Sequence, residues 1–250
     1  MRKKVLTVLE IFFILVFIFS VAQIIRIVNN YKKGDAIYET AKTYVEDTHE
    51  KDGDKEEYYF TIDLKSLKEI NPEVMGWIRI PDTPIDYPLL QGTDNKYYLK
   101  HTYDNQYSDF GSIFLDHRCV FLDSNTVIYG HNTRNGSMFG SLKEYRNSEY
   151  LEKHPYVYVL YGGIERKYRI IALLTVDTSN PDPAYALNKG SDANQKKWLE
   201  EQLAKSEIPQ IKTDEITGKE KILTLSTCTS RIKTERLVIM AEEVGIVWEK

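Results

Sequence analysis

The sequence predicts a mainly β domain, either a barrel or a sandwich, with helices at the N-terminus and one helix late in the chain. The composition favours strands, because 18 of the 250 residues are tyrosine and β-branched residues are frequent. Short apolar or alternating runs bounded by Gly, Pro, Asn and Asp recur between residues 76 and 130. After these runs, a clear helical pattern covers Asp192–Lys205. Many short strands with one late helix are typical of a β-barrel or a sandwich.

The first thirty residues form a unit of their own, which we expect to be a membrane anchor. Val5–Val28 is long enough to cross a bilayer as a helix, and it follows the basic start "MRKK". A cleaved signal peptide is the alternative, because "SVA" before Gln23 resembles a cleavage site. The apolar run continues beyond that point to Val28, which favours an uncleaved anchor in contact with membrane lipid. With either interpretation, the rest of the chain lies outside the cytoplasm.

Residues 31–62 are expected to connect this anchor to the main domain, residues 63–250. Asp35–Glu46 has its apolar residues on one helical face, which predicts an amphipathic helix. The charged stretch "EDTHEKDGDKEE" that follows predicts a flexible linker. Its Asp52 and Asp54 do not have the glycine and closing glutamate of a calcium-binding loop at the required offsets.

The elements of the main domain follow from local patterns. A short helix is expected over Asp63–Ile70, and it should stop before Pro72. "GWIRIP", "PIDYPLL", "GSIFLD" and "NTVIYG" predict strands, and residues 156–176 predict two longer strands that meet at Gly162-Gly163. Ser191 is the expected N-cap of the late helix. "KILTLS" and "RLVIMAEEV" predict the last two strands.

The charge and the cysteine count exclude several classes of protein. A net charge of −4 with a pI near 5.8 argues against a nucleic-acid-binding protein, which normally has a basic face. Two cysteines are too few for a disulfide-stapled scaffold, although a bridge between Cys119 and Cys228 stays open as an alternative. His117 and Cys119 together supply only two ligands, which do not make a zinc site.

Cys228 is a candidate nucleophile because of its place at the end of an expected strand. Side chains alternate along a strand, so Cys228 shares the more polar face with Thr224 and Ser226. If the next strand pairs antiparallel with it, an arginine at the start of that strand, Arg236, lies close to the thiol. A guanidinium favours the thiolate and stabilises an oxyanion. The competing interpretation is a buried cysteine followed by a surface arginine.

A cysteine nucleophile needs a base, which is normally a histidine. Of the five histidines, His131 has the most suggestive position, because it directly follows the strand "TVIY" on one face with Tyr129. Gly130 between them permits a close approach of the backbone. A second strand therefore ends in a titratable group, as the Cys228 strand does. The other four histidines lie in loops or charged segments.

These motifs together resemble the sortase family, and class B in particular. "TLSTC", the arginine eight residues later before "LVIM", and "VIYGHN" with Met138-Phe139 occur in the order typical of that class. "LLQGTDNKYYL" and "GSIFLD" are also similar to class B sequences. The resemblance covers residues 71–244 and adds the N-terminal anchor. It implies a closed β-barrel of about eight strands, with one helix in a long late connection.

The resemblance implies a transpeptidase on the outer face of a Gram-positive cell. Cys228 would attack the carbonyl of a threonine in the C-terminal sorting signal of a surface protein and form a thioester. An amine from a peptidoglycan peptide, or from a pilin lysine, would resolve it. His131 would transfer the protons, and Arg236 would hold the substrate near the oxyanion. The resemblance calls for no metal or other cofactor.

The resemblance also implies a set of substrate-binding residues, each of which has ordinary packing as its alternative role. They are Asn95, Leu99, Tyr129, Tyr185, Ser226 and Thr227. Arg231 lies between Cys228 and Arg236, so it competes with Arg236 for the role of the active-site arginine.

Two other functions stay open from the residues alone. A cysteine peptidase would use the same pair with water as the acceptor, although papain-like and related cell-wall peptidases place Cys before His in the chain. A tethered binding module without activity would hold Cys228 and His131 as packed residues. Alkylation of the thiol tests the second alternative, and an added amine tests the first.

Overall fold

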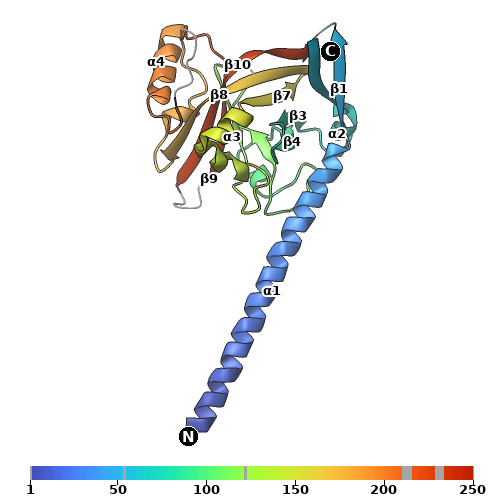
Figure 1. Cartoon of the computed structure of the whole chain (residues 1–250), viewed down its shortest axis with the longest axis vertical. Helices are drawn as coiled ribbons and strands as arrows, with labels where there is room; N and C mark the ends of the chain where they lie inside the picture. Colours follow the sequence, from blue (N-terminus) through green and yellow to red (C-terminus); the bar gives the residue numbers. More distant parts are fainter. Residues whose placement is uncertain (1, 53–54, 121–122, 210–215, 229–233, 250) are drawn as a thin grey trace.

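Eight strands close into a barrel, which decides between the barrel and the sandwich (Figure 1). The computed structural model describes residues 2–52, 55–120, 123–209, 216–228 and 234–249. The strand order around the barrel is β10-β8-β7-β3-β4-β5-β6-β9. The barrel strands are β3 (Val74–Arg79), β4 (Asp86–Leu90), β5 (Ile113–Leu115), β6 (Asn125–Tyr129), β7 (Tyr156–Tyr161), β8 (Ile164–Asp177), β9 (Ile222–Cys228) and β10 (Glu235–Glu249). The pairs β4–β5 and β6–β9 are parallel, and the others are antiparallel.

Short helices fill the connections. They are α2 (Leu64–Ile70), α3 (Ser148–Lys153), α4 (Asp192–Leu203) and the 3₁₀ turns η1 (Tyr97–Leu99), η2 (Gly140–Arg146) and η3 (Pro183–Tyr185). The expected stop of α2 at Asn71 and the expected N-cap of α4 are confirmed, since the Ser191 side chain accepts the Asn194 N–H at 3.3 Å. The turn between β7 and β8 is also confirmed, because Gly162 and Gly163 have φ of 63° and 83°.

The alternation expected along β9 is present in the packing. Leu223 and Leu225 belong to the main core of the barrel. Ile222 instead joins a second apolar cluster, in which Trp198 and Leu199 of α4 pack against Val238 of β10. The two faces of β9 therefore differ, because Leu223 and Leu225 enter the barrel core whereas Thr224 and Ser226 on the other face have polar partners. This difference fixes the register, because a slip by one residue would exchange the two faces.

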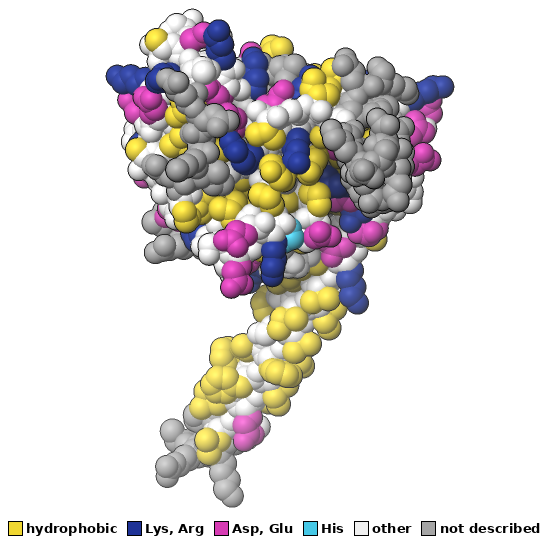
Figure 2. All heavy atoms as spheres, turned by 45° about the horizontal axis from the view of Figure 1, so that its top comes forward, with side chains coloured by type: hydrophobic (Ala, Val, Ile, Leu, Met, Phe, Trp, Pro, Cys, Tyr) yellow, Lys and Arg dark blue, Asp and Glu magenta, His cyan; other side chains and the backbone are white. Residues whose placement is uncertain are grey.

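A single helix, α1 (Arg2–Lys42), covers both the expected anchor and the expected amphipathic helix, and it ends four residues before Glu46. Its N-terminal part extends away from the barrel with hydrophobic side chains on its surface (Figures 1 and 2). Leu9–Lys42 is long and apolar enough to cross a membrane, with a mean hydropathy of 2.6 in its most apolar window. The C-terminal part packs on the barrel through Tyr38 and Ala41, which are buried. Gly34 permits this contact, because an added Cβ would lie 2.6 Å from the Phe110 ring.

The expectation of a flexible linker after this helix is wrong. The chain forms an antiparallel hairpin of β1 (Val45–Asp52) and β2 (Lys55–Ile62), in register from Val45↔Ile62 to Asp52↔Lys55. The contacts of this hairpin with the barrel explain why it is ordered. Arg79 of β3 forms ion pairs with Asp47 of the hairpin and with Asp86 of β4, and its guanidinium lies 4.5 Å from the centre of the buried Phe60 ring. Because most residues of this stretch are charged, the sequence pattern did not indicate these few contacts with the barrel.

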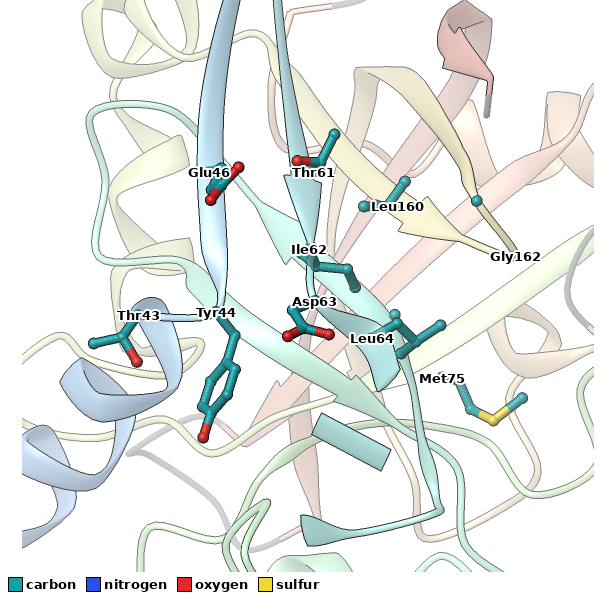
Figure 3. A pocket seen from close by; sticks show the side chains of 12 residues that line it. Thr43, Tyr44, Glu46, Thr61, Ile62, Asp63, Leu64, Met75, Leu160 and Gly162 are labelled. Carbon is teal, nitrogen blue, oxygen red and sulfur yellow. The ribbon is translucent and has the colours of Figure 1, made fainter. Parts of the chain in front are cut away.

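A cavity of about 680 Å³ lies between the base of this hairpin, the start of α2 and the β7–β8 turn (Figure 3). Glu46 and Thr61 face each other across the hairpin at its edge. Asp63 also lines the cavity, but its carboxylate caps α2 by accepting the Ser66 N–H at 3.0 Å. None of the candidate catalytic or substrate-binding residues lines this cavity.

Glu165 of β8 is a buried carboxyl beneath the hairpin. Its Oε2 accepts the N–H of Phe60 at 3.1 Å, and its residue is 1% exposed. Burial raises the pKa of Glu165 to about 7, against the lowering effects of the Phe60 hydrogen bond and of Arg79. The folded protein therefore holds a proton on this group between the ordinary pKa of 4.5 and about 7, where the unfolded chain has lost it. The resulting stabilisation is complete below the lower value and is lost as the pH rises through the higher one.

We expect Glu165→Gln to make the protein more stable than the wild type at about pH 8 and to reduce the difference at about pH 5. The amide keeps an acceptor for Phe60 and does not ionise, so the gain in free energy of unfolding at the higher pH is on the order of 1–3 kcal/mol. Thermal unfolding of the full-length chain in detergent at both pH values measures this. Glu152→Gln, at an exposed position of α3, is the control. Parallel pH profiles for Glu165→Gln and the wild type would contradict the assignment.

Candidate active site

Three neighbouring strands, β6, β9 and β10, carry or lead directly to the three candidate catalytic residues. β9 pairs with β10 so that Cys228 lies directly opposite Arg236 in the antiparallel register. On the other side, β6 runs parallel to β9 with Tyr129 opposite Ser226. Cys228 lies two residues beyond Ser226 in β9, and His131 follows Tyr129, the last residue of β6, by two residues. Because adjacent strands are about 4.8 Å apart, the paired positions Cys228 and Arg236 are direct neighbours.

The register of the last hairpin is the one expected from the sequence. Arg236 and Val238 share the face of their strand with Met240, and they lie opposite Cys228, Ser226 and Thr224. Arg236 is half-buried, and its Nη1 donates to the carbonyl of Glu235 at 3.0 Å. The Cys228 side chain and the whole of Arg231 lie outside the described part of the chain.

A hydrogen bond to Leu99 and close packing against Gly111 fix the ring of His131. Its Nε2 lies 2.7 Å from the carbonyl oxygen of Leu99. A carbonyl oxygen only accepts, so Nε2 carries the hydrogen, and Nδ1 of the neutral ring is the proton acceptor. At Gly111, with φ of 58°, an added Cβ would lie 3.0 Å from the Cδ2 of His131. The close approach expected at Gly130 is confirmed, since a Cβ there would lie 2.4 Å from Ile113.

A groove of about 290 Å³ opens beside these residues. Most of the candidate site residues line it, namely Asn95, Leu99, Tyr129, His131, Ser226, Thr227 and Arg236. Phe114 and Gly130 complete the lining. Tyr185 does not line the groove itself, but its hydroxyl lies 2.8 Å from the Ser226 Oγ behind it. The Oγ1 of Thr227 is buried without a hydrogen-bond partner among the described residues.

A buried carboxylate that the sequence reasoning missed supports the floor of the groove. Asp116 is fully buried, and Arg118 donates to both of its oxygens, at 2.9 and 2.8 Å. The Tyr129 hydroxyl donates to the same carboxylate at 2.9 Å. Burial alone would raise the pKa of Asp116, but the hydrogen bonds from Arg118, Tyr129 and Asn95 hold it well below its ordinary value. Asp116 therefore fixes two candidate substrate-binding residues. Its place directly after the apolar run "SIFL" was the available signal.

Cys119 and two of the other histidines, His101 and His154, have contacts that indicate structural roles. Cys119 is a free, buried thiol, so the alternative of a disulfide with Cys228 is wrong. Burial raises the pKa of Cys119 to about 11, which keeps it protonated and unreactive. His101 stacks on Tyr97 with ring centres 3.9 Å apart. The Nδ1 of His154 lies 3.1 Å from the carbonyl of Pro81. Among the residues that the structure describes, no His, Cys, Asp and Glu side chains form a group of three or more able to hold a metal.

Comparison with known proteins agrees with this geometry. The family model of the sortase domain matches residues 78–244. The chain belongs to the sortase family. Sortase B of Listeria monocytogenes is 37% identical over 188 residues, which are 73% of this chain and 74% of that protein.

Solved structures of sortase B have the same fold. The X-ray structure of Clostridium perfringens sortase B aligns with a TM-score of 0.69 and 32% identity, and it covers 73% of this chain and 100% of that one. The Staphylococcus aureus sortase B–substrate complex aligns with a TM-score of 0.66 and 29% identity, over 72% of this chain and 83% of that one. These relatives place the sortase described here in class B. It is a cysteine transpeptidase of surface proteins, and its apolar N-terminal helix is compatible with a single membrane anchor.

Proposed function

We propose that this sortase cleaves the C-terminal sorting signal of surface proteins after a threonine and joins the new end to a cell-wall amine. The observation that carries the proposal is the register of β9 and β10, which pairs Cys228 with Arg236, together with the groove that His131 and Arg236 both line. The acceptor is the amine of a peptidoglycan peptide or of a pilin lysine. Both acceptors call for the same chemistry at the thioester.

The reaction has two proton-coupled halves. The Cys228 thiol gives its proton to His131 and its sulfur attacks the threonine carbonyl; the C–N bond then breaks, and the leaving amine takes that proton from His131. The product is a thioester with the surface protein. The incoming amine then attacks the thioester carbonyl, gives a proton to His131 and releases the sulfur. Arg236 stabilises the negative charge on the oxygen in both tetrahedral intermediates.

The groove beside His131 is the proposed binding site for the sorting signal. Asn95 and Leu99 line one wall, and Tyr129, Ser226 and Thr227 line the other parts, with Tyr185 fixing Ser226 from behind. The partnerless Oγ1 of Thr227 supports this role, because a peptide backbone supplies the missing partner. The similarity to a sortase B–substrate complex also supports a peptide in this groove.

The proposed experiment incubates the full-length chain with a panel of labelled sorting peptides, with and without an added amine. We expect one peptide to be cleaved after threonine and to form an amide when the amine is present. Cleavage without any amide product would favour a cysteine peptidase instead. Binding without cleavage would favour a tethered binding module. The panel includes signals similar to NPQTN and proline-rich signals that end in TG.

We also propose that α1 keeps the enzyme in the membrane, with residues beyond about Tyr31 outside the cell. The exposed apolar surface of this helix supports an uncleaved anchor. We expect the protein in the membrane fraction, with its domain accessible to a protease added outside intact cells. Recovery of a soluble protein that begins at Gln23 would show that the segment is a cleaved signal peptide.

A further inference from the structure

His131 forms part of the wall of two separate cavities. One is the groove described above. The other, which we name the helix-side cavity, has a volume of about 230 Å³ and is lined by Ile27, Asn30 and Tyr31 of α1 together with Asp109, Phe110 and His131. His131 is therefore shared by the groove and a space that is also lined by the apolar N-terminal helix.

The second half of the reaction needs room for the acceptor beside the base. When the acyl group occupies the groove, the acceptor must reach the same carbonyl and give a proton to the same histidine. By microscopic reversibility, the incoming amine approaches beside His131, where the first amine departed. A second cavity that also has His131 in its wall offers a route to this position.

The polar groups of the helix-side cavity suit an ammonium group. Lys100 Nζ lies 2.6 Å from the Oδ1 of Asp109, and this carboxylate is 64% exposed. The Lys100 hydrogen bond holds the pKa of Asp109 below its ordinary value, with smaller effects from Arg26 and His131. A carboxylate accepts several hydrogen bonds, so Asp109 keeps acceptor capacity for a further N–H donor beside Lys100. Asn30 is exposed on the facing helix and adds an amide.

The position of the cavity along α1 points to the membrane surface. The apolar run of the anchor ends at Val28, so Ile27 and Asn30 mark the end of the expected span. The helix does not break there, and Gly34 and Tyr38 hold its next turns against the barrel. The cavity is thus fixed beside the point where the chain emerges from the bilayer.

We propose that the helix-side cavity is the entrance and binding site for the primary amine that accepts the acyl group. This inference rests on the proposed function. The acceptor is a peptide that carries a free amine. Such a peptide comes either from solution or from a carrier held in the membrane, and both sources supply the same reactive group.

The test uses the full-length chain in phospholipid vesicles, with one cleavable sorting peptide and two amine probes, triglycine in solution and triglycine tethered to a phospholipid. Asn30→Trp fills the cavity, and Asn29→Trp is the matched control, because Asn29 is exposed but does not line it. Thioester formation is followed by mass, and the ratio of amide to hydrolysis product is measured against the amine concentration.

We expect Asn30→Trp to raise the amine concentration for half-maximal amide formation by on the order of tenfold, with normal thioester formation. Asn29→Trp should match the wild type. A loss with both probes supports a binding site for the amine itself, and a loss with the tethered probe alone supports an entrance from the membrane. A normal thioester with an unchanged product ratio overturns the inference. Absence of any thioester in the wild type would instead overturn the proposed function.

Discussion

Replacement of Cys228 by alanine is expected to abolish cleavage of every sorting peptide and to leave the fold intact. The position lies at the last residue of β9, where the strand is already held by its pairing with β6 and β10. Loss of the sulfur removes the nucleophile, and no other group supplies the thioester. Peptide cleavage and the mass of the acyl-enzyme measure the effect, and circular dichroism measures the fold.

Cys119→Ala is the matched control for this experiment, because it removes the other thiol of the chain. Cys119 is buried, and the N–H of Val127 lies 3.4 Å from its sulfur, so its loss should affect stability more than cleavage. We expect this variant to keep its activity at temperatures where it is folded. An inactive but folded Cys119→Ala beside an active Cys228→Ala would show that the nucleophile has been assigned to the wrong cysteine.

Arg236→Ala and Arg236→Lys are expected to lose most of the activity. The register holds Arg236 opposite Cys228, and its side chain lines the groove. Removal of a preorganised oxyanion donor typically costs about 2.7–4 kcal/mol, or roughly a hundred- to a thousandfold in rate. Lysine is a poor substitute, because a single ammonium does not reproduce the planar fork of a guanidinium. Steady-state cleavage of the same peptide measures both variants.

Arg231→Ala is the control for this second prediction, and we expect it to lose little activity. Arg231 lies in the connection between the two strands, whereas the pleat of β10 fixes the face of Arg236. The prediction fails if Arg231→Ala is inactive while Arg236→Ala cleaves at the normal rate. That pair of results would show that Arg231, and not Arg236, stabilises the oxyanion.

The candidate catalytic residues could be predicted from strand periodicity and register, which are local properties, whereas the substrate-binding residues were expected only from the resemblance. Alternation along β9 separated Leu223 and Leu225 from Ser226, and the same rule gave the pairing of Arg236 with Cys228. Positive φ at Gly162 and Gly163 followed from the two adjacent glycines alone. In each of these cases, neighbouring residues determine the geometry.

The parts that the sequence did not reveal depend on contacts between distant segments. The β1–β2 hairpin is ordered by Arg79 and Glu165, which come from β3 and β8. The role of Asp116 depends on Arg118 nearby but also on Tyr129, which reaches it from the neighbouring region of the barrel. Closure of the barrel was expected only from the resemblance, because local patterns do not distinguish a barrel from a sandwich.

The parallel pairing of β6 with β9 also bears on how the enzyme becomes active. These strands are far apart in the chain, so their contact costs more loop-closure entropy than a hairpin and is slow to form. β9 and β10 follow the other described barrel strands in the chain, and β9 joins the barrel between β6 and β10. The positions of Cys228 and His131 therefore come together only when the barrel closes. With the roles proposed for these residues, a chain whose barrel is open has no complete active site, and activity is coupled to completion of the fold.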